Sequence, residues 1–223
     1  SASQLEPLLA KYLASIPTTN SKEEYKDKEI KWLSEKIDKD IYLEMEDPKA
    51  SVRVALEKKA DYTVKNKLVA KAIGDILRLR YTETLREDEG GTYGAGVKAK
   101  LAKEPVPKAH IEISFDCNPD KVEKLVSIVH AELQKIAKGI IDQQDLDKTL
   151  TSFLKERKQS KDKNSYDMKL LTTFYRDGYN MNDPENFENI VNNITKNDIK
   201  KLAKLLVNKG KSYEIVFKPD FGS

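Results

Sequence analysis

Residues 85–94, which read Leu-Arg-Glu-Asp-Glu-Gly-Gly-Thr-Tyr-Gly, hold the side chains best suited to chemistry. Arg86 is expected at the end of a long helix and Tyr93 at the start of a strand, so the two can meet across the turn. A guanidinium and a phenol aimed at one point donate hydrogen bonds without a competing acceptor, which suits a peptide carbonyl or a developing oxyanion. Alternatively, Arg86 pairs with Glu87 or Glu89 and Tyr93 packs as an ordinary strand aromatic. The residues alone favour this second interpretation.

Other catalytic patterns are weak or missing in the sequence. A zinc site needs ligands that converge, and neither His110 nor His130 begins an inverted H-x-x-E-H motif. We expect His110 to face solvent with Glu112 on one side of a strand, and His130 to lie at the surface of a helix. Residues 90–96 are rich in glycine, but they lead from helix to strand and lack the Lys-Ser/Thr of a phosphate-binding loop.

Composition excludes several further classes of protein. The chain has 223 residues with 40 Lys plus Arg against 37 Asp plus Glu, a net charge of +3 that makes no case for nucleic-acid binding or a polybasic membrane patch. Cys117 is the single cysteine, which excludes an internal disulfide and a cysteine-based zinc site. No apolar run approaches the roughly 18 residues of a membrane helix. The start at Ser1 lacks Met and a signal-peptide core, so we expect a segment of a longer protein.

The spacing of apolar residues predicts the elements that position the 85–94 run. Residues 1–35 are expected to be a leading helix, stopped by Pro17, and a surface connector of the same domain; residues 36–223 form the main domain. Within it the patterns predict strands at 41–45, 52–56, 93–101, 110–117 and 213–218, and helices at 63–86, 119–139, 142–154, 165–177, 183–194 and 195–210.

These elements predict an α+β fold. Antiparallel strands interrupted by long amphipathic helices favour a two-layer sandwich, in which a mostly antiparallel sheet has helices packed on one face. The first two strands are expected to run antiparallel. Asp142 with Asp145, and Thr195 with Asp198, resemble paired capping residues at two helix starts.

Residues 86–93 resemble the Arg-Glu...Gly...Tyr signature of the C-terminal, non-zinc domain of the pitrilysin/insulinase family of inverted-motif zinc metallopeptidases. The run from Leu5 to Pro17 also resembles the helix that precedes the connector in such domains. The resemblance covers nearly the whole chain, lacking only the domain's first strand. It is greatest to the last domain of bacterial members that carry four such domains in one chain.

The resemblance implies a fold and a role. Domains of this family are α/β sandwiches, and two halves joined by a linker close around an unfolded peptide or small protein. The N-terminal half holds zinc; the C-terminal half supplies an Arg and a Tyr that bind the substrate carbonyl and stabilise the tetrahedral intermediate. Those roles fall on Arg86 and Tyr93. This segment would bind no metal or other cofactor, and its partners would be the zinc-bearing half and the peptide. A periplasmic or envelope location is implied, although the sequence leaves the compartment open.

Two other functions stay open at this point. In the first, the chain is a non-catalytic scaffold or partner domain of a peptidase-like complex, and Arg86 with the acidic run serves docking. In the second, it is a small hydrolase with an unrecognised site, which would require activity from the purified chain. The sequence does not identify the natural substrate, the cleavage preference or the oligomeric state. It also does not establish whether the parent chain keeps an intact zinc motif.

Overall fold

The computed structural model describes residues 1–19, 21, 35–45, 49–88, 92, 94–177 and 183–220; for 86–88, 176–177 and 183–185 it describes the backbone only. The chain divides into two units, Ser1–Ile30 and Lys31–Ser223. Most of the predicted connector, residues 20 and 22–34, lies outside the described residues.

The first unit contains the leading helix that the sequence predicts. Helix α1 (Ala2–Leu9) continues into the wider π-type turns of η1 (Ala10–Ala14). Ser1 and Gln4 form a capping box at its start. The helix is amphipathic, and its large apolar side chains all remain more than two-fifths exposed: Leu5, Leu8, Leu9, Tyr12, Leu13 and Ile16.

The described residues of the second unit form one five-stranded sheet in the order β1-β5-β2-β4-β3. Strands β2, β4, β3 and β5 pair antiparallel, whereas β1 pairs parallel to β5. The sheet is therefore mostly antiparallel, as expected, and β3 is one of its edges. The strands are β1 (Lys36–Leu43), β2 (Ala50–Lys59), β3 (Gly96–Ala102), β4 (Lys108–Cys117) and β5 (Lys211–Pro219).

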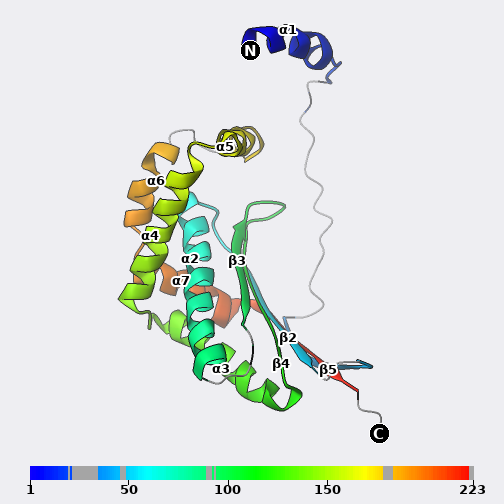
Figure 1. Cartoon of the computed structure of the whole chain (residues 1–223), viewed down its shortest axis with the longest axis vertical. Coiled ribbons are helices and arrows are strands. Elements are labelled where there is room, and N and C mark those ends of the chain that lie inside the picture. The colour runs from blue at the N-terminus through cyan, green and yellow to red at the C-terminus, as the bar shows by residue number, and fades with distance from the viewer. Residues whose placement is uncertain are drawn as a thin grey trace. The chain divides into compact units, whose positions relative to one another are not determined.

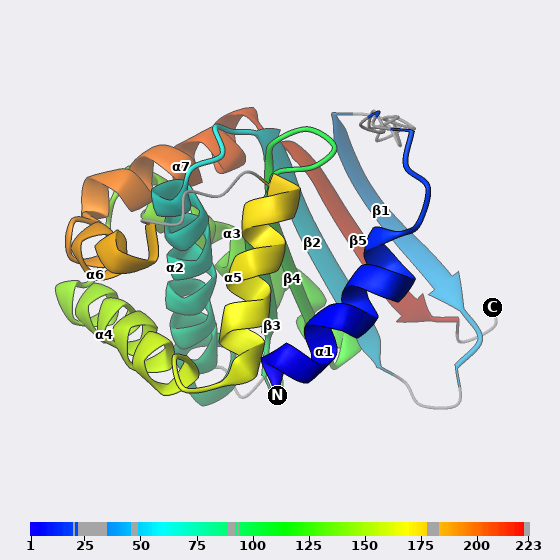
Figure 2. The ribbon, with the colours of Figure 1, turned by 90° about the horizontal axis from the view of Figure 1, so that it is seen from above.

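Helices cover one face of this sheet, which confirms the predicted two-layer α+β fold (Figures 1 and 2). Alternate residues of β2 and β4 are buried beneath them, from Val52 to Leu56 and from Ala109 to Cys117, because successive strand side chains point to opposite faces. The opposite face of these two strands is mixed and polar. The helices are α2 (Val64–Tyr81), α3 (Val122–Lys138), α4 (Gln143–Ser160), α5 (Asn164–Asp177), α6 (Asp183–Asn192) and α7 (Lys196–Lys209), with short η2 (Thr82–Asp88) and η3 (Pro119–Lys121).

One close approach brings α2 onto the edge strand. A Cβ atom placed on Gly74 would lie 2.8 Å from the Cβ of Ala99, which is nearer than two carbons pack. Glycine is normally unfavourable inside a helix, costing about 1 kcal/mol relative to alanine. At this position it lets the helix lie directly against β3.

The capping predictions are partly right. Thr195 and Asp198 form a reciprocal capping box at the start of α7, and Asp142 accepts from the backbone N–H of Gln144 at the start of α4. Asp145, expected as the partner of Asp142, instead points to Arg80 of α2, with 3.2 Å between Oδ2 and Nε. The contact with Arg80 joins two full charges, whereas a capping bond joins the carboxylate to a neutral backbone N–H.

The first strand differs most from expectation. It begins at Lys36 rather than residue 41, and although β1 and β2 run antiparallel, β5 lies between them. Asp38 and Asp40 obscure the alternation in the sequence, because they point to the helix-bearing side of the sheet yet remain exposed. The predicted helix at 63–86 likewise ends its regular α turns at Tyr81 and widens into η2.

Candidate functional site

Only part of the predicted Arg86 and Tyr93 pair falls within the described residues. Arg86 lies in η2, where the structure gives the course of the backbone but not of this side chain, and Tyr93 lies outside the described residues. The structure describes both ends of the turn, the helical end at residues 81–85 and the strand end at Val97. Side-chain contacts hold the backbone at each end.

The helical end is held by two fully buried side chains on either side of the start of η2. Tyr81 and Leu85 are each 0% exposed. The Tyr81 hydroxyl donates to the backbone carbonyl of Val129 on α3, at 3.1 Å. Burial, with the nearby negative charge of Glu132, raises the pKa of Tyr81 well above its ordinary value, so the hydroxyl stays a donor. Leu85 directly precedes Arg86 and fixes where η2 leaves the core.

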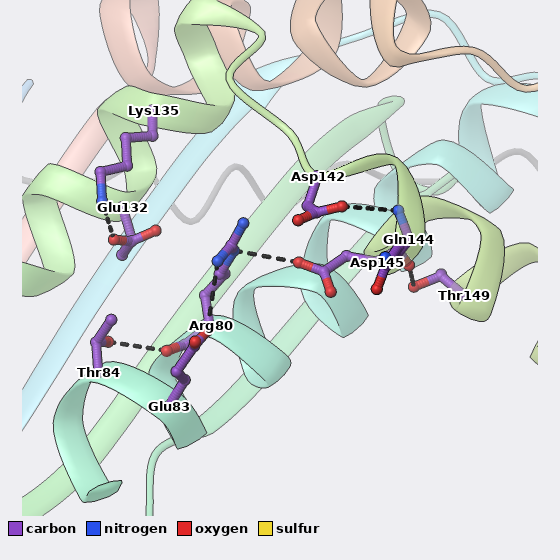
Figure 3. A network of polar contacts seen from close by, with 9 residues as sticks. All are labelled: Arg80, Glu83, Thr84, Glu132, Lys135, Asp142, Gln144, Asp145 and Thr149. Carbon is purple, nitrogen blue, oxygen red and sulfur yellow. Dashed lines mark hydrogen bonds and ion pairs between the residues drawn. The ribbon is translucent and has the colours of Figure 1, made fainter. Parts of the chain in front are cut away.

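A polar network holds the same helix end from the other side (Figure 3). Arg80 lies between two carboxylates, 3.3 Å from Glu83 within η2 and 3.2 Å from Asp145 on α4. The Thr84 hydroxyl donates to the carbonyl oxygen of Arg80 at 2.8 Å. These contacts join η2, which carries Arg86, to Arg80 of α2, and they join Arg80 to α4.

The strand end of the turn is tied to the helix end by Arg78. Its Nη2 donates to the carbonyl oxygen of Val97 at 2.8 Å, and its Nη1 contacts Asp75 at 2.9 Å. Just before β3, the Thr92 hydroxyl exchanges contacts of 3.2 and 3.3 Å with the backbone of Gly94. Sequence analysis missed Arg78 and Arg80 as positioning residues. The available signal was their spacing on α2, which places basic groups in its last turn.

The described residues do not fit a zinc ion. No group of three His, Cys, Asp or Glu side chains among them could hold a metal. The two histidines point to opposite sides of the sheet: His110 is paired in register with Glu57 on the face away from the helices, whereas His130 of α3 contacts Glu214 at 2.5 Å on the helix side. A five-stranded sheet therefore separates them, and no step of a reaction can be derived through a metal held by both.

His110 is more enclosed than the sequence suggested. Its side chain is only 22% exposed, and its two ring nitrogens each lie 3.9 Å from a carboxylate, of Glu57 and of Glu112. Burial lowers the pKa of His110, with Lys100 acting in the same direction and both carboxylates opposing it. The imidazole is thus a half-buried neutral group on the sheet. His130 is 47% exposed, as expected for a surface residue.

The comparisons with known proteins agree on one family. The family model for the peptidase M16 inactive domain matches residues 1–153. No curated protein matches the sequence. Within the described residues, no helix is both long enough and apolar enough to cross a membrane.

Several solved structures share the fold at low identity. The ferredoxin protease FusC, solved in complex with Arabidopsis ferredoxin, superposes with a TM-score of 0.79 at 21% identity over 99% of this chain and 24% of its own. The periplasmic protease PqqL from Escherichia coli gives 0.80 at 15% identity, again over 99% and 24%. A peptidase M16 inactive domain from Pseudomonas fluorescens gives 0.68 at 16% over 84% and 44%. The chain thus spans about a quarter of the length of FusC and PqqL.

Proposed function

Since this chain belongs to the peptidase M16 inactive domain family, we propose that it is the substrate-binding, non-zinc domain of a zinc metalloendopeptidase that cleaves peptides or unfolded polypeptides. By itself the domain is inactive. It acts with the zinc-bearing half of the same parent protein, where zinc supplies the Lewis acid for peptide hydrolysis. The family's designation as the inactive domain agrees with a segment that holds no metal.

Arg86 and Tyr93 are the residues that contact substrate on this proposal. Their guanidinium and phenol groups donate hydrogen bonds to the carbonyl oxygen of the scissile peptide, and those bonds strengthen as negative charge develops there. Both groups carry their protons at neutral pH and can donate, because Arg is permanently charged and a Tyr hydroxyl has its pKa near 10.

The observation that carries the proposal is the anchoring of both ends of the turn. Tyr81 and Leu85 in the core, Arg80 on α4 and Arg78 on β3 hold the backbone on both sides of the turn. A donor pair that must meet a transition state needs fixed ends, because misplacement by about 1 Å costs large factors in rate.

The test restores activity from two parts. The chain is combined with the zinc-bearing half of its parent protein, and cleavage of a quenched fluorescent peptide is followed with wild type, Arg86→Ala and Tyr93→Phe. Each change should lower turnover by about 100-fold or more. Arg53→Ala and Tyr42→Phe are the matched controls, since both side chains are more than half exposed and lie on the sheet. Unchanged turnover in both site variants would leave the scaffold function as the better account.

A further inference from the structure

A hollow of about 790 Å³ lies at the open edge of β3, away from the turn that carries Arg86. Its walls are the first turns of α2, the second half of α4, α5 and Phe187 of α6, with residues 99–101 of β3 along one side. The volume falls within the roughly 300–1,000 Å³ that is typical of ligand sites in proteins.

The walls of the hollow are strongly positive. Four basic side chains line it against the single acid Glu156: Lys67, Lys71, Arg157 and Lys169. Lys100 also borders the hollow, but it is paired in register with His110 and its side chain points to the face away from the helices. Four positive charges against one negative charge give the hollow a net charge of +3, equal to that of the whole chain. Clefts lined by one sign of charge concentrate ligands of the opposite sign. The charge therefore selects an anionic occupant.

The same walls also offer apolar and aromatic surface. Lys71 lies over the ring of Phe153 at 4.3 Å while it pairs with Glu156 at 2.6 Å, and Arg157 lies between the rings of Tyr166 and Phe187 at 4.9 and 4.5 Å. These contacts hold two of the four cations, Lys71 and Arg157, in place. Lys67 and Lys169 are exposed at the rim, one on α2 and one on α5, where they can reach an incoming ligand.

The β3 edge adds backbone groups that recognise a peptide. The carbonyl oxygen of Val97 faces away from β4, since it accepts from Arg78. Residues two apart in a strand point the same way, so the N–H and C=O groups of Ala99 and Leu101 also face the open edge. Within the described part of the chain, neither residue makes a hydrogen bond on that side. An extended peptide can pair with such an edge as an added strand.

We propose that this hollow binds an extended, acidic segment of a polypeptide substrate, which pairs with the backbone of Ala99 and Leu101 and places carboxylates beside Lys67, Lys71 and Lys169. This inference rests on the proposed function, because it takes the occupant to be substrate. It adds a second contact region, separate from Arg86 and Tyr93, and a preference for substrates with acidic stretches flanking the cleaved bond.

The experiment measures peptide binding to the purified chain by fluorescence anisotropy. The probe is a labelled peptide of alternating Glu and Val, and its counterpart alternates Lys and Val. We expect the acidic peptide alone to bind, and its affinity to fall as salt is raised. The paired variant Lys67→Glu with Lys169→Glu should weaken binding about tenfold or more. The control pair Lys201→Glu with Lys204→Glu makes the same charge change on exposed positions of α7 and should leave affinity within about twofold.

Strand addition has its own readout. Bound peptide should slow amide hydrogen exchange at Ala99 and Leu101, measured by NMR, without a matching change at Lys98 and Lys100, whose amides face β4. Equal binding of the Lys-Val peptide, equal weakening by both variant pairs, or unchanged exchange at Ala99 and Leu101 each overturns the inference. If the acidic peptide does not bind but Arg86→Ala still lowers the turnover of the recombined halves, the proposed function stands and only the acidic subsite is wrong.

Discussion

Arg78 donates a hydrogen bond from Nη2 to the carbonyl oxygen of Val97 across 2.8 Å, although 19 residues separate the two in sequence. The bond joins the last turns of α2 to the start of β3. Arg86 and Tyr93 both fall between these two residues in the sequence. We therefore expect the position of the proposed donor pair to depend on a contact that neither donor makes.

Replacing Arg78 with Met should lower peptide cleavage by more than the loss in folding stability accounts for. The change keeps much of the aliphatic stem and removes both the bond to Val97 and the contact with Asp75. We expect a loss of about 1 kcal/mol in the free energy of unfolding, since Arg78 is 53% exposed. Restored peptide cleavage should fall further than that loss explains, with turnover reduced more than KM is raised. Cleavage that is unchanged would mean that this anchor does not position Arg86 and Tyr93.

Tyr81→Phe should weaken the attachment of η2 to α3. The ring still fills its buried site, but the bond to the carbonyl oxygen of Val129 is lost. We expect a cost of about 1 kcal/mol in chemical denaturation, typical of one buried hydrogen bond. Tyr42→Phe, at an exposed position of β1, is the control and should leave the free energy of unfolding unchanged.

Gly74→Ala should destabilise the domain although alanine is the better helix former. The new methyl group would lie 2.8 Å from the Cβ of Ala99, so α2 and β3 must move apart. Overpacking costs about 1–3 kcal/mol and the gain in helix propensity is about 1 kcal/mol, which leaves a net loss. Thermal unfolding measures it. An increase in the melting temperature would show that α2 lies less tightly against β3 than described.

Asp198→Asn should reveal a pH-dependent contribution to stability. Burial raises the pKa of Asp198, but hydrogen bonds from Lys65 and Thr195 outweigh it, so the folded-state pKa lies below the ordinary aspartate value of 3.8. The charged form therefore stabilises the fold above the unfolded-state pKa, and this contribution is lost as the pH falls through the folded-state pKa.

At neutral pH the Asn variant should be less stable than wild type by about 1 kcal/mol, a typical capping contribution. The difference should close below pH 3.8. Urea denaturation at a series of pH values measures the gap, with Asp162→Asn as an exposed control. A gap that is constant with pH would contradict an ionised Asp198 as the source.

Local patterns predicted the elements well because their causes are local. Alternation in β2 and β4, and the Thr195 and Asp198 capping box, depend on neighbours within a few residues. Pairings between distant segments were not predictable in this way. The parallel match of β1 with β5 joins Lys36 to Ser212, and Asp145 pairs with Arg80 from another helix rather than with its own cap.

The same contrast between local patterns and distant pairings applies to the candidate site. Arg86 and Tyr93 were singled out by their side-chain chemistry, and their role was assigned through a resemblance carried by eight consecutive residues. The partners of Arg78 and Arg80, and the basic hollow beside β3, depend on how α2, α4, α5 and β3 are brought together. A charge count over the chain could not locate that hollow, since the basic and acidic residues nearly balance.

Turnover by the recombined halves tests the central claim most directly. The wild-type chain, Arg86→Ala and Tyr93→Phe are each combined with the zinc-bearing half, and single-substrate kinetics are measured on one peptide after equal folding is confirmed by circular dichroism. The account predicts turnover lower by about 100-fold or more in each variant, because each removes a donor to the developing oxyanion. Variants that cleave as fast as wild type would contradict it.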